Sequence, residues 1–244
     1  MLMIIYKRAL AVLLKKPLKL WGLSLLAILL TSVLGTLCGA AIPVLGISIG
    51  LLISTAMTII FLKGYRGEEV GVKQLFECFK DWNTIKRVLL GLGWMNLWIF
   101  LWSLIPIVGP IFALIRIYEY RLTPYILMFE PEVSITDAIE ISKQKTNGYK
   151  LQMWLADFVY ILLYFAAIIL LSLFSVIPVL GVLFALALFV LNIAFIALAP
   201  LFAGLVQAAF YEEINSVAIR YCSKCGFKIS SETATCPNCG NNAQ

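Results

Sequence analysis

Charged residues divide this chain into long apolar stretches separated by short polar ones. No Asp, Glu, Lys or Arg occurs within residues 20–62, 88–115 or 158–211. A helix needs about 20 apolar residues to cross ~30 Å of hydrocarbon, at ~1.5 Å per residue. The first and last stretches are each long enough for two crossings joined by a short turn. The pattern therefore predicts an all-α integral membrane protein that crosses the bilayer several times.

Uninterrupted hydropathy predicts five spans, near residues 20–42, 44–62, 88–108, 155–176 and 182–208. A sixth segment, residues 110–129, contains Arg116, Glu119 and Arg121, and hydropathy alone would reject it. Without this span, the basic segment that follows it would lie outside, against the positive-inside bias. With six spans, every charged segment lies on one side. We therefore expect six transmembrane helices in the cell membrane, with both termini cytoplasmic.

Three similar hexapeptides separate the members of the predicted helix pairs: "AIPVLG" at 41–46, "LIPIVG" at 104–109 and "VIPVLG" at 176–181. Proline cannot donate the hydrogen bond that continues the incoming helix. Glycine can adopt positive φ and so let the chain reverse. We therefore expect three helical hairpins whose outer tips are Pro43/Gly46, Pro106/Gly109 and Pro178/Gly181.

An amphipathic segment precedes each hairpin, at residues 6–21, 72–89 and 134–150. Each has the alternation of basic and apolar positions that suits a helix lying in the headgroup plane. In the last of them, Ser134 followed by Asp137 predicts a capped helix start. A repeat of interfacial helix, span, tight turn and span divides the membrane domain, residues 1–214, into hairpin units of about 1–66, 67–132 and 133–214.

Several segments of the second half resemble one bacterial family of multi-pass membrane proteins. The similar segments are "LWSLIPIVG", "TPYILMFEPEVSITDAIEIS", "NGYK", Asp157 within "LADFVY", and "LAPLFAGLVQAAFYEEI". The family is the domain-of-unknown-function 975 family, itself distantly similar to the membrane domain of some glycerophosphodiester phosphodiesterases. The resemblance implies a helical membrane fold. It implies no activity, because the family's own function is unassigned. The catalytic barrel of those phosphodiesterases is absent from this sequence, so their chemistry is not carried over.

The last thirty or so residues change character, with a linker at 215–220 and a polar, cysteine-rich segment at 221–244. The spacing is C-x2-C, ten residues, then C-x2-C-G, which lets four thiolates reach one ion. Such a closed tetrahedral site binds one structural Zn²⁺, and the metal then supplies most of the folding energy of so small a domain. Iron or a redox dithiol pair are the alternatives. The expected ligands are Cys222, Cys225, Cys236 and Cys239.

This expected zinc ribbon has few basic residues. Lys224 and Lys228 are the ones it contains, which is too few for the clustered phosphate contacts of nucleic-acid binding. We therefore expect the ribbon to dock a cytoplasmic protein partner. A reducing cytoplasm would also keep its thiolates from forming disulfides.

Charged residues within the predicted spans define a candidate polar cluster. Arg116 and Glu119 are three residues apart on one helix face and are expected to pair. Arg121 needs another acid, and Asp157 is the candidate. Intramembrane charge is costly and is often functional, so the cluster is either a polar pathway or headgroup site, or an ion-pair network that fixes helix packing. Asn96 and Asn192 are expected to form hydrogen bonds between helices.

The chain contains no histidine. That excludes histidine-based general acid–base catalysis and Ser-His triads, and no Gly-rich phosphate loop is present either. We therefore expect a protein that is not an enzyme. The favoured hypothesis is a membrane protein that organises lipids or protein partners, with the zinc ribbon as its docking module. The alternative is a transporter of a small solute or lipid that uses the intramembrane charges.

Overall fold

Five helices of the computed structural model are long and apolar enough to cross a membrane, judged by length and composition. They are Lys19–Ala40, Pro43–Tyr65, Trp82–Ser103, Lys150–Ser175 and Gly181–Asn215. The structure describes residues 2–15, 17–175, 181–216, 219–221 and 228–230. All of the described elements are helices apart from two short strands. The prediction of a helical chain with several membrane-spanning segments is therefore confirmed at this level.

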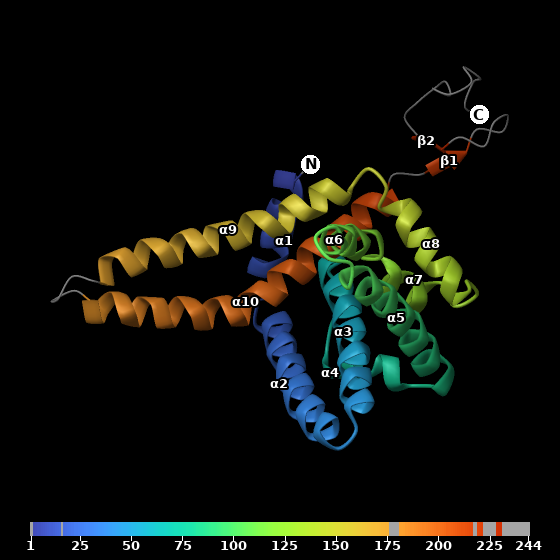
Figure 1. The fold of residues 1–244 in the computed structure, drawn as a ribbon, viewed down its shortest axis with the longest axis horizontal. Coiled ribbons are helices and arrows are strands. Elements are labelled where there is room, and N and C mark those ends of the chain that lie inside the picture. Colours follow the sequence, from blue (N-terminus) through green and yellow to red (C-terminus); the bar gives the residue numbers. More distant parts are fainter. Residues whose placement is uncertain (1, 16, 176–180, 217–218, 222–227, 231–244) are drawn as a thin grey trace. The chain divides into compact units, whose positions relative to one another are not determined.

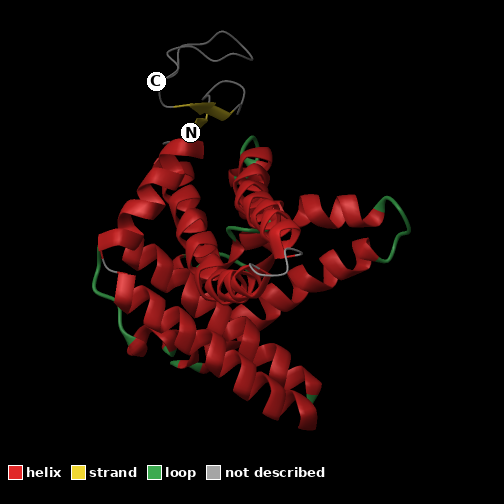
Figure 2. Ribbon diagram, turned by 90° about the vertical axis from the view of Figure 1, so that its left-hand side faces the viewer, coloured by secondary structure: helices red, strands yellow, loops and turns green. Residues whose placement is uncertain are grey.

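The chain divides into two units, Met1–Ala209 and Phe210–Gln244. Figures 1 and 2 show that the first unit is built of helices. In chain order these are α1 (Leu2–Lys15), α2 (Pro17–Ala41), α3 (Pro43–Tyr65), α4 (Val72–Leu75), the short 3-10 helix η1 (Glu77–Phe79), α5 (Trp82–Ser103), α6 (Gly109–Glu119), α7 (Thr123–Phe129), α8 (Ile135–Lys145), α9 (Lys150–Ser175) and α10 (Gly181–Ser216), which continues into the second unit.

Two of the predicted hairpin tips lie where the sequence placed them. Between α2 and α3, Ile42 alone is extended (φ −141°, ψ 102°) and Pro43 opens the next helix, because a residue before proline avoids the helical region while proline suits the first helical position. Between α5 and α6 the chain reverses over residues 104–108, with Ile107 at φ 66°. Residues 176–180, with Pro178, lie outside the described residues.

The tip glycines serve a different purpose from the one expected. Among the described residues, positive φ occurs at Ile107, Gly67 and Gly148, so the expectation of positive φ at the tip glycines is wrong. A Cβ added at Gly46 would lie 2.7 Å from the carbonyl oxygen of Gly35, and one at Gly181 would lie 2.5 Å from that of Ser175.

The glycine at the second tip, Gly109, has the same kind of neighbour. A Cβ there would meet the carbonyl oxygen of Trp102 on α5. At all three tips, therefore, the glycine lies near the start of the outgoing helix and faces a backbone carbonyl of the incoming one. Its missing side chain permits close approach of two backbones, as small residues do between membrane helices.

The amphipathic segments before the hairpins do not share one structure. Residues 72–89 form α4, η1 and the first turns of α5 rather than one helix. The break occurs because Asp81 caps a new helix, accepting hydrogen bonds from Thr84 N (2.9 Å) and Thr84 Oγ1 (2.6 Å). These bonds from Thr84 lower the pKa of Asp81. The predicted cap of α8 is confirmed, since Ser134 Oγ accepts from Asp137 N at 3.1 Å.

The segment predicted as the sixth span is not one continuous helix. It forms α6, an 11-residue helix, and α7, a 7-residue helix, with a break at residues 120–122. At ~1.5 Å per residue, α6 extends only about half of a ~30 Å hydrocarbon layer. Pro124 stands in the first turn of α7, where its missing N–H costs least.

Burial is concentrated at the helix ends remote from the tips. Ile60 and Leu62, late in α3, and Val88, early in α5, are fully buried. By contrast, Val44 near the first tip is 69% exposed and Val182 near the third is 76% exposed. The described core therefore lies where the charged segments meet, and the apolar tip halves of the helices are exposed.

The third hairpin is held by aromatic side chains. Tyr164 of α9 stacks on Phe195 of α10 with ring centroids 3.7 Å apart. The Tyr164 hydroxyl donates to Asn192 Oδ1 at 2.7 Å, so Asn192 forms the expected bond between helices. Asn96 does not, since its amide nitrogen donates to Leu92 O of its own helix.

In the second unit, β1 (Ile219–Tyr221) and β2 (Lys228–Ser230) form an antiparallel pair. Tyr221 lies opposite Lys228 and Ile219 opposite Ser230. Cys222, Cys225, Cys236 and Cys239 lie outside the described residues.

Candidate functional site

The four charged residues predicted as a cluster form two ion pairs. Arg116 and Glu119, one helical turn apart on α6, are bonded to each other. Arg121, in the break between α6 and α7, reaches Asp157 on α9, with Nη2 3.1 Å from Oδ1 and a second contact through Nη1. These are the pairings expected from the sequence. We call α6, α7 and the break between them the return segment. The second pair joins the break in this segment to the first half of α9.

The sequence interpretation missed two members of this cluster. Lys150 Nζ lies 2.6 Å from Glu119 Oε1, and the Tyr118 hydroxyl donates to Asp157 Oδ2 at 3.1 Å. Lys150 was discoverable, because it precedes Asp157 by seven residues, and seven residues bring a helix back to the same face. Glu119, whose side chain is 7% exposed, is thus held between two cations.

The backbone at the break is bonded to side chains of two other helices. Ser142 Oγ of α8 donates to Glu119 O at 2.8 Å and accepts from Leu122 N at 3.2 Å. Gln207 Nε2 of α10 donates to Arg121 O at 2.9 Å. These groups are left unpaired by the interruption of the helix and would be costly to bury without partners. The break is therefore a defined element of the fold.

The C-terminus of α7 is also fixed from outside. Arg87 of α5 donates through Nε to Leu127 O at 3.0 Å and through Nη2 to Glu130 O at 2.7 Å. A cation at this end satisfies the last carbonyls and complements the helix dipole. Arg87 and Arg121 together anchor the short return segment, one at the end of α7 and the other at the break.

The arrangement indicates a structural role for the charge cluster. Each of its carboxylates has at least one cationic partner, and Glu119 has two. Partly buried pairs of this kind are costly to break, since removal of one partner leaves the other charge uncompensated. The cluster therefore holds α6 and α9 together around the break.

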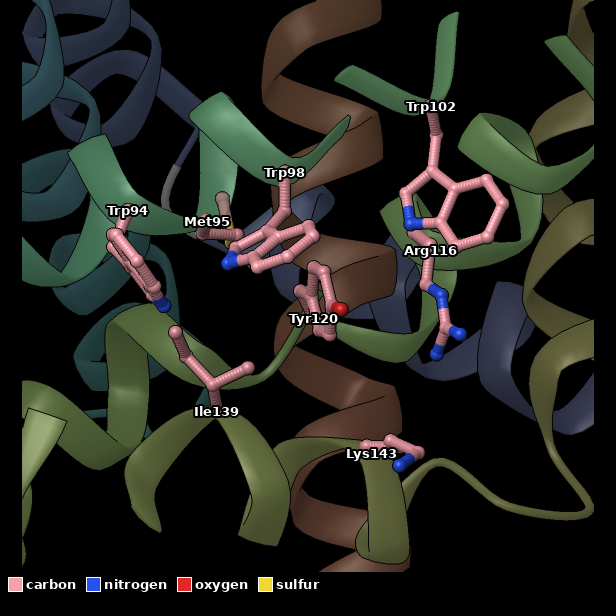
Figure 3. A pocket seen from close by; sticks show the side chains of 8 residues that line it. All are labelled: Trp94, Met95, Trp98, Trp102, Arg116, Tyr120, Ile139 and Lys143. Atoms are coloured by element: carbon pink, nitrogen blue, oxygen red, sulfur yellow. The ribbon is translucent and has the colours of Figure 1, made fainter. Parts of the chain in front are cut away.

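A cavity of about 290 Å³ lies between α5, α6 and α8, on the side of Arg116 (Figure 3). The Arg116 guanidinium carbon is 5.8 Å from the centroid of the Trp102 ring. Figure 3 shows three indoles along one side and the nitrogen atoms of Arg116 and Lys143 on another. We call this the tryptophan pocket; its lining residues are Trp94, Met95, Trp98, Trp102, Arg116, Tyr120, Ile139 and Lys143. The sequence interpretation missed it, although the four-residue spacing of the tryptophans was visible.

Comparisons with models of known families, with curated proteins and with solved structures found no match to this chain. The resemblance to the domain-of-unknown-function 975 family stays a prediction. The zinc site also stays a prediction, because its four cysteines lie outside the described residues.

Proposed function

We propose that this chain is a non-enzymatic membrane protein that organises lipids and a protein partner at the cytoplasmic face, with its C-terminal cysteine segment as the docking module. The observation that carries the proposal is the internal pairing of Arg116, Glu119, Arg121, Asp157 and Lys150. These charges are engaged in holding the fold, and the sequence supplies no histidine to move protons.

The transporter alternative needs charges that can exchange partners as a solute passes. In the described part of the cluster, Asp157 is bonded to both Arg121 and Tyr118, and Glu119 to both Arg116 and Lys150. Backbone bonds from α8 and α10 fix the same break. This interlocked arrangement favours a rigid scaffold.

We also propose a topology of five full spans and one return segment, α6–α7, that is broken at residues 120–122. Both termini and the charged connections would then lie in the cytoplasm. The positive-inside bias supports this assignment, since the break carries Arg121 and the following segment carries Lys143, Lys145 and Lys150.

The strand pair supports the zinc ribbon. Tyr221, the last residue of β1, lies opposite Lys228, the first of β2. Cys222 directly follows β1 and Cys225 lies three residues before β2, so the first cysteine pair lies in sequence between two paired strands. Four thiolates would hold Zn²⁺ with no open position, and the ion would be structural.

The test measures metal content and partner recovery on the full chain. Purified protein is expected to hold one zinc per chain by elemental mass spectrometry, and Cys236→Ser is expected to lose it. Cys38→Ser, a cysteine in α2, is the matched control. A crosslinked partner should be recovered with the full chain and with Cys38→Ser, and lost with Cys236→Ser. Equal recovery from all three would refute the docking role.

A further inference from the structure

We infer that the tryptophan pocket binds the phosphate-bearing headgroup of an anionic lipid. The inference rests on the proposed membrane location and not on the zinc ribbon. The pocket adjoins the paired cluster and shares Arg116 with it, but it opens between α5, α6 and α8.

One wall of the pocket is a ladder of indoles. Trp94, Trp98 and Trp102 are four residues apart, so they follow one face of α5. Trp94 and Trp98 meet edge to face at 5.9 Å, and Trp102 stacks on Phe112 of α6 at 5.2 Å. Trp94 is 46% exposed and Trp98 42% exposed. Indoles with an apolar body and a polar N–H are suited to the boundary between headgroups and acyl chains.

The other wall supplies two positive charges from different helices. Arg116 comes from α6 and Lys143 from α8, and their nitrogen atoms are drawn on one side of the pocket in Figure 3. A guanidinium presents several N–H donors in a planar fork that matches phosphate oxygens, and a lysine ammonium acts as a point charge beside it. The charge of the pocket is therefore complementary to a phosphate group.

Both cations can serve a ligand without leaving a carboxylate unpaired in the interior. Arg116 shares Glu119 with Lys150, so Glu119 keeps a cationic partner when Arg116 turns toward a phosphate. Lys143 contacts Glu140 at 3.1 Å in a pair whose side chains are 42% and 53% exposed. An exposed pair of this kind is weak, so a phosphate can compete with Glu140.

The surroundings favour a lipid over a free phosphate. Leu97 and Leu101 of α5, each three residues after an indole, are 46% and 44% exposed, and acyl chains would cover them. The cavity volume of about 290 Å³ is close to the lower end of the ~300–1,000 Å³ range of small-ligand pockets. A headgroup would occupy the cavity while its chains follow α5 outward.

The test counts bound lipid on the full chain by native mass spectrometry, with phosphatidylglycerol and phosphatidylcholine as probes. Wild-type protein is expected to retain phosphatidylglycerol roughly tenfold more strongly than Lys143→Gln does, the effect of one lost charge-assisted hydrogen bond. Trp98→Leu should weaken retention as well. Lys86→Gln is the matched control, because Lys86 lies 5.8 Å from the Trp82 ring on the same helix, outside the pocket.

Three results would overturn the inference. One is equal retention of phosphatidylcholine, and another is an equal loss with Lys86→Gln. The third is displacement by soluble glycerol phosphate at the same concentration as the lipid, which would identify a site for a free phosphate ester. Lys143 is chosen because its pair is exposed, so its replacement leaves the fold intact. Zinc content and partner recovery are unaffected by these variants, which separates this test from that of the proposed function.

Discussion

The Arg121–Asp157 pair gives the sharpest test of the structural role assigned to the charge cluster. Both side chains are 16% exposed, and the pair joins the α6–α7 break to α9. Asp157→Asn keeps the size of the side chain and removes its charge. Arg121 then remains in place with no carboxylate, and breaking a buried pair in this way costs on the order of 3–5 kcal/mol.

We expect a cost near the lower end of that range, about 3 kcal/mol, because one sixth of each side chain is in contact with solvent. For a domain of this size, ~1 kcal/mol shifts the melting temperature by roughly 2–4 °C. The variant should therefore melt ~6–12 °C lower. Thermal unfolding in detergent, followed by tryptophan fluorescence, measures this shift.

Two further variants test whether the loss of stability comes from an uncompensated buried charge. Arg121→Met combined with Asp157→Leu removes both charges, and it should restore most of the lost stability, because apolar replacement of a whole buried pair is often neutral. Glu140→Gln removes an exposed partner of Lys143 and should cost less than ~1 kcal/mol. Equal melting temperatures for Asp157→Asn and Glu140→Gln would refute the structural role of the cluster.

Three smaller predictions follow from individual contacts. Gly46→Ala should destabilise the first hairpin by ~1–3 kcal/mol through overpacking, whereas Gly22→Ala, whose added Cβ meets nothing within 4 Å, should be neutral or stabilising in the same melting assay. Ser142→Ala should cost ~1–3 kcal/mol, since it leaves the buried Leu122 amide unpaired and leaves Glu119 O with the Thr146 hydroxyl as its side-chain partner. Burial raises the pKa of the Cys78 thiol to about 12, so maleimide should leave it unlabelled at pH 8. The folded state holds this proton more tightly than the unfolded one, so the contribution of Cys78 to stability should fall as pH rises from about 9 towards 12, measured by alkaline denaturation.

The long apolar segments could be predicted because the hydropathy and the length of each segment can be read directly from the order of apolar and charged residues. The first two hairpin tips could be predicted because proline acts on the residue before it, as Ile42 shows at the first of them. The role of the tip glycines could not be predicted in this way. Positive φ is the common local reason for glycine, whereas Gly46 is required by the carbonyl of Gly35, a contact that exists only once two helices are packed.

In the site, too, the features that depend on local sequence were predicted, and those that depend on packing between distant segments were missed. Two acids and two bases within apolar segments have few possible partners, so the pairs Arg116–Glu119 and Arg121–Asp157 followed from counting charges. The division of residues 110–129 into two helices did not. It depends on Ser142 and Gln207, which satisfy the interrupted backbone from distant parts of the chain.

The break at residues 120–122 connects the charge cluster to the tryptophan pocket. α6 ends at Glu119, and Tyr120, the first residue of the break, lines the pocket together with Lys143 of α8 and the indoles in the second half of α5. Arg116 belongs to both features, since it pairs with Glu119 and lines the pocket. The charge cluster and the pocket are therefore adjoining parts of one region of the fold. Arg116 of α6 and Lys143 of α8 thus bring two cations to the side of α5 that carries Trp94, Trp98 and Trp102.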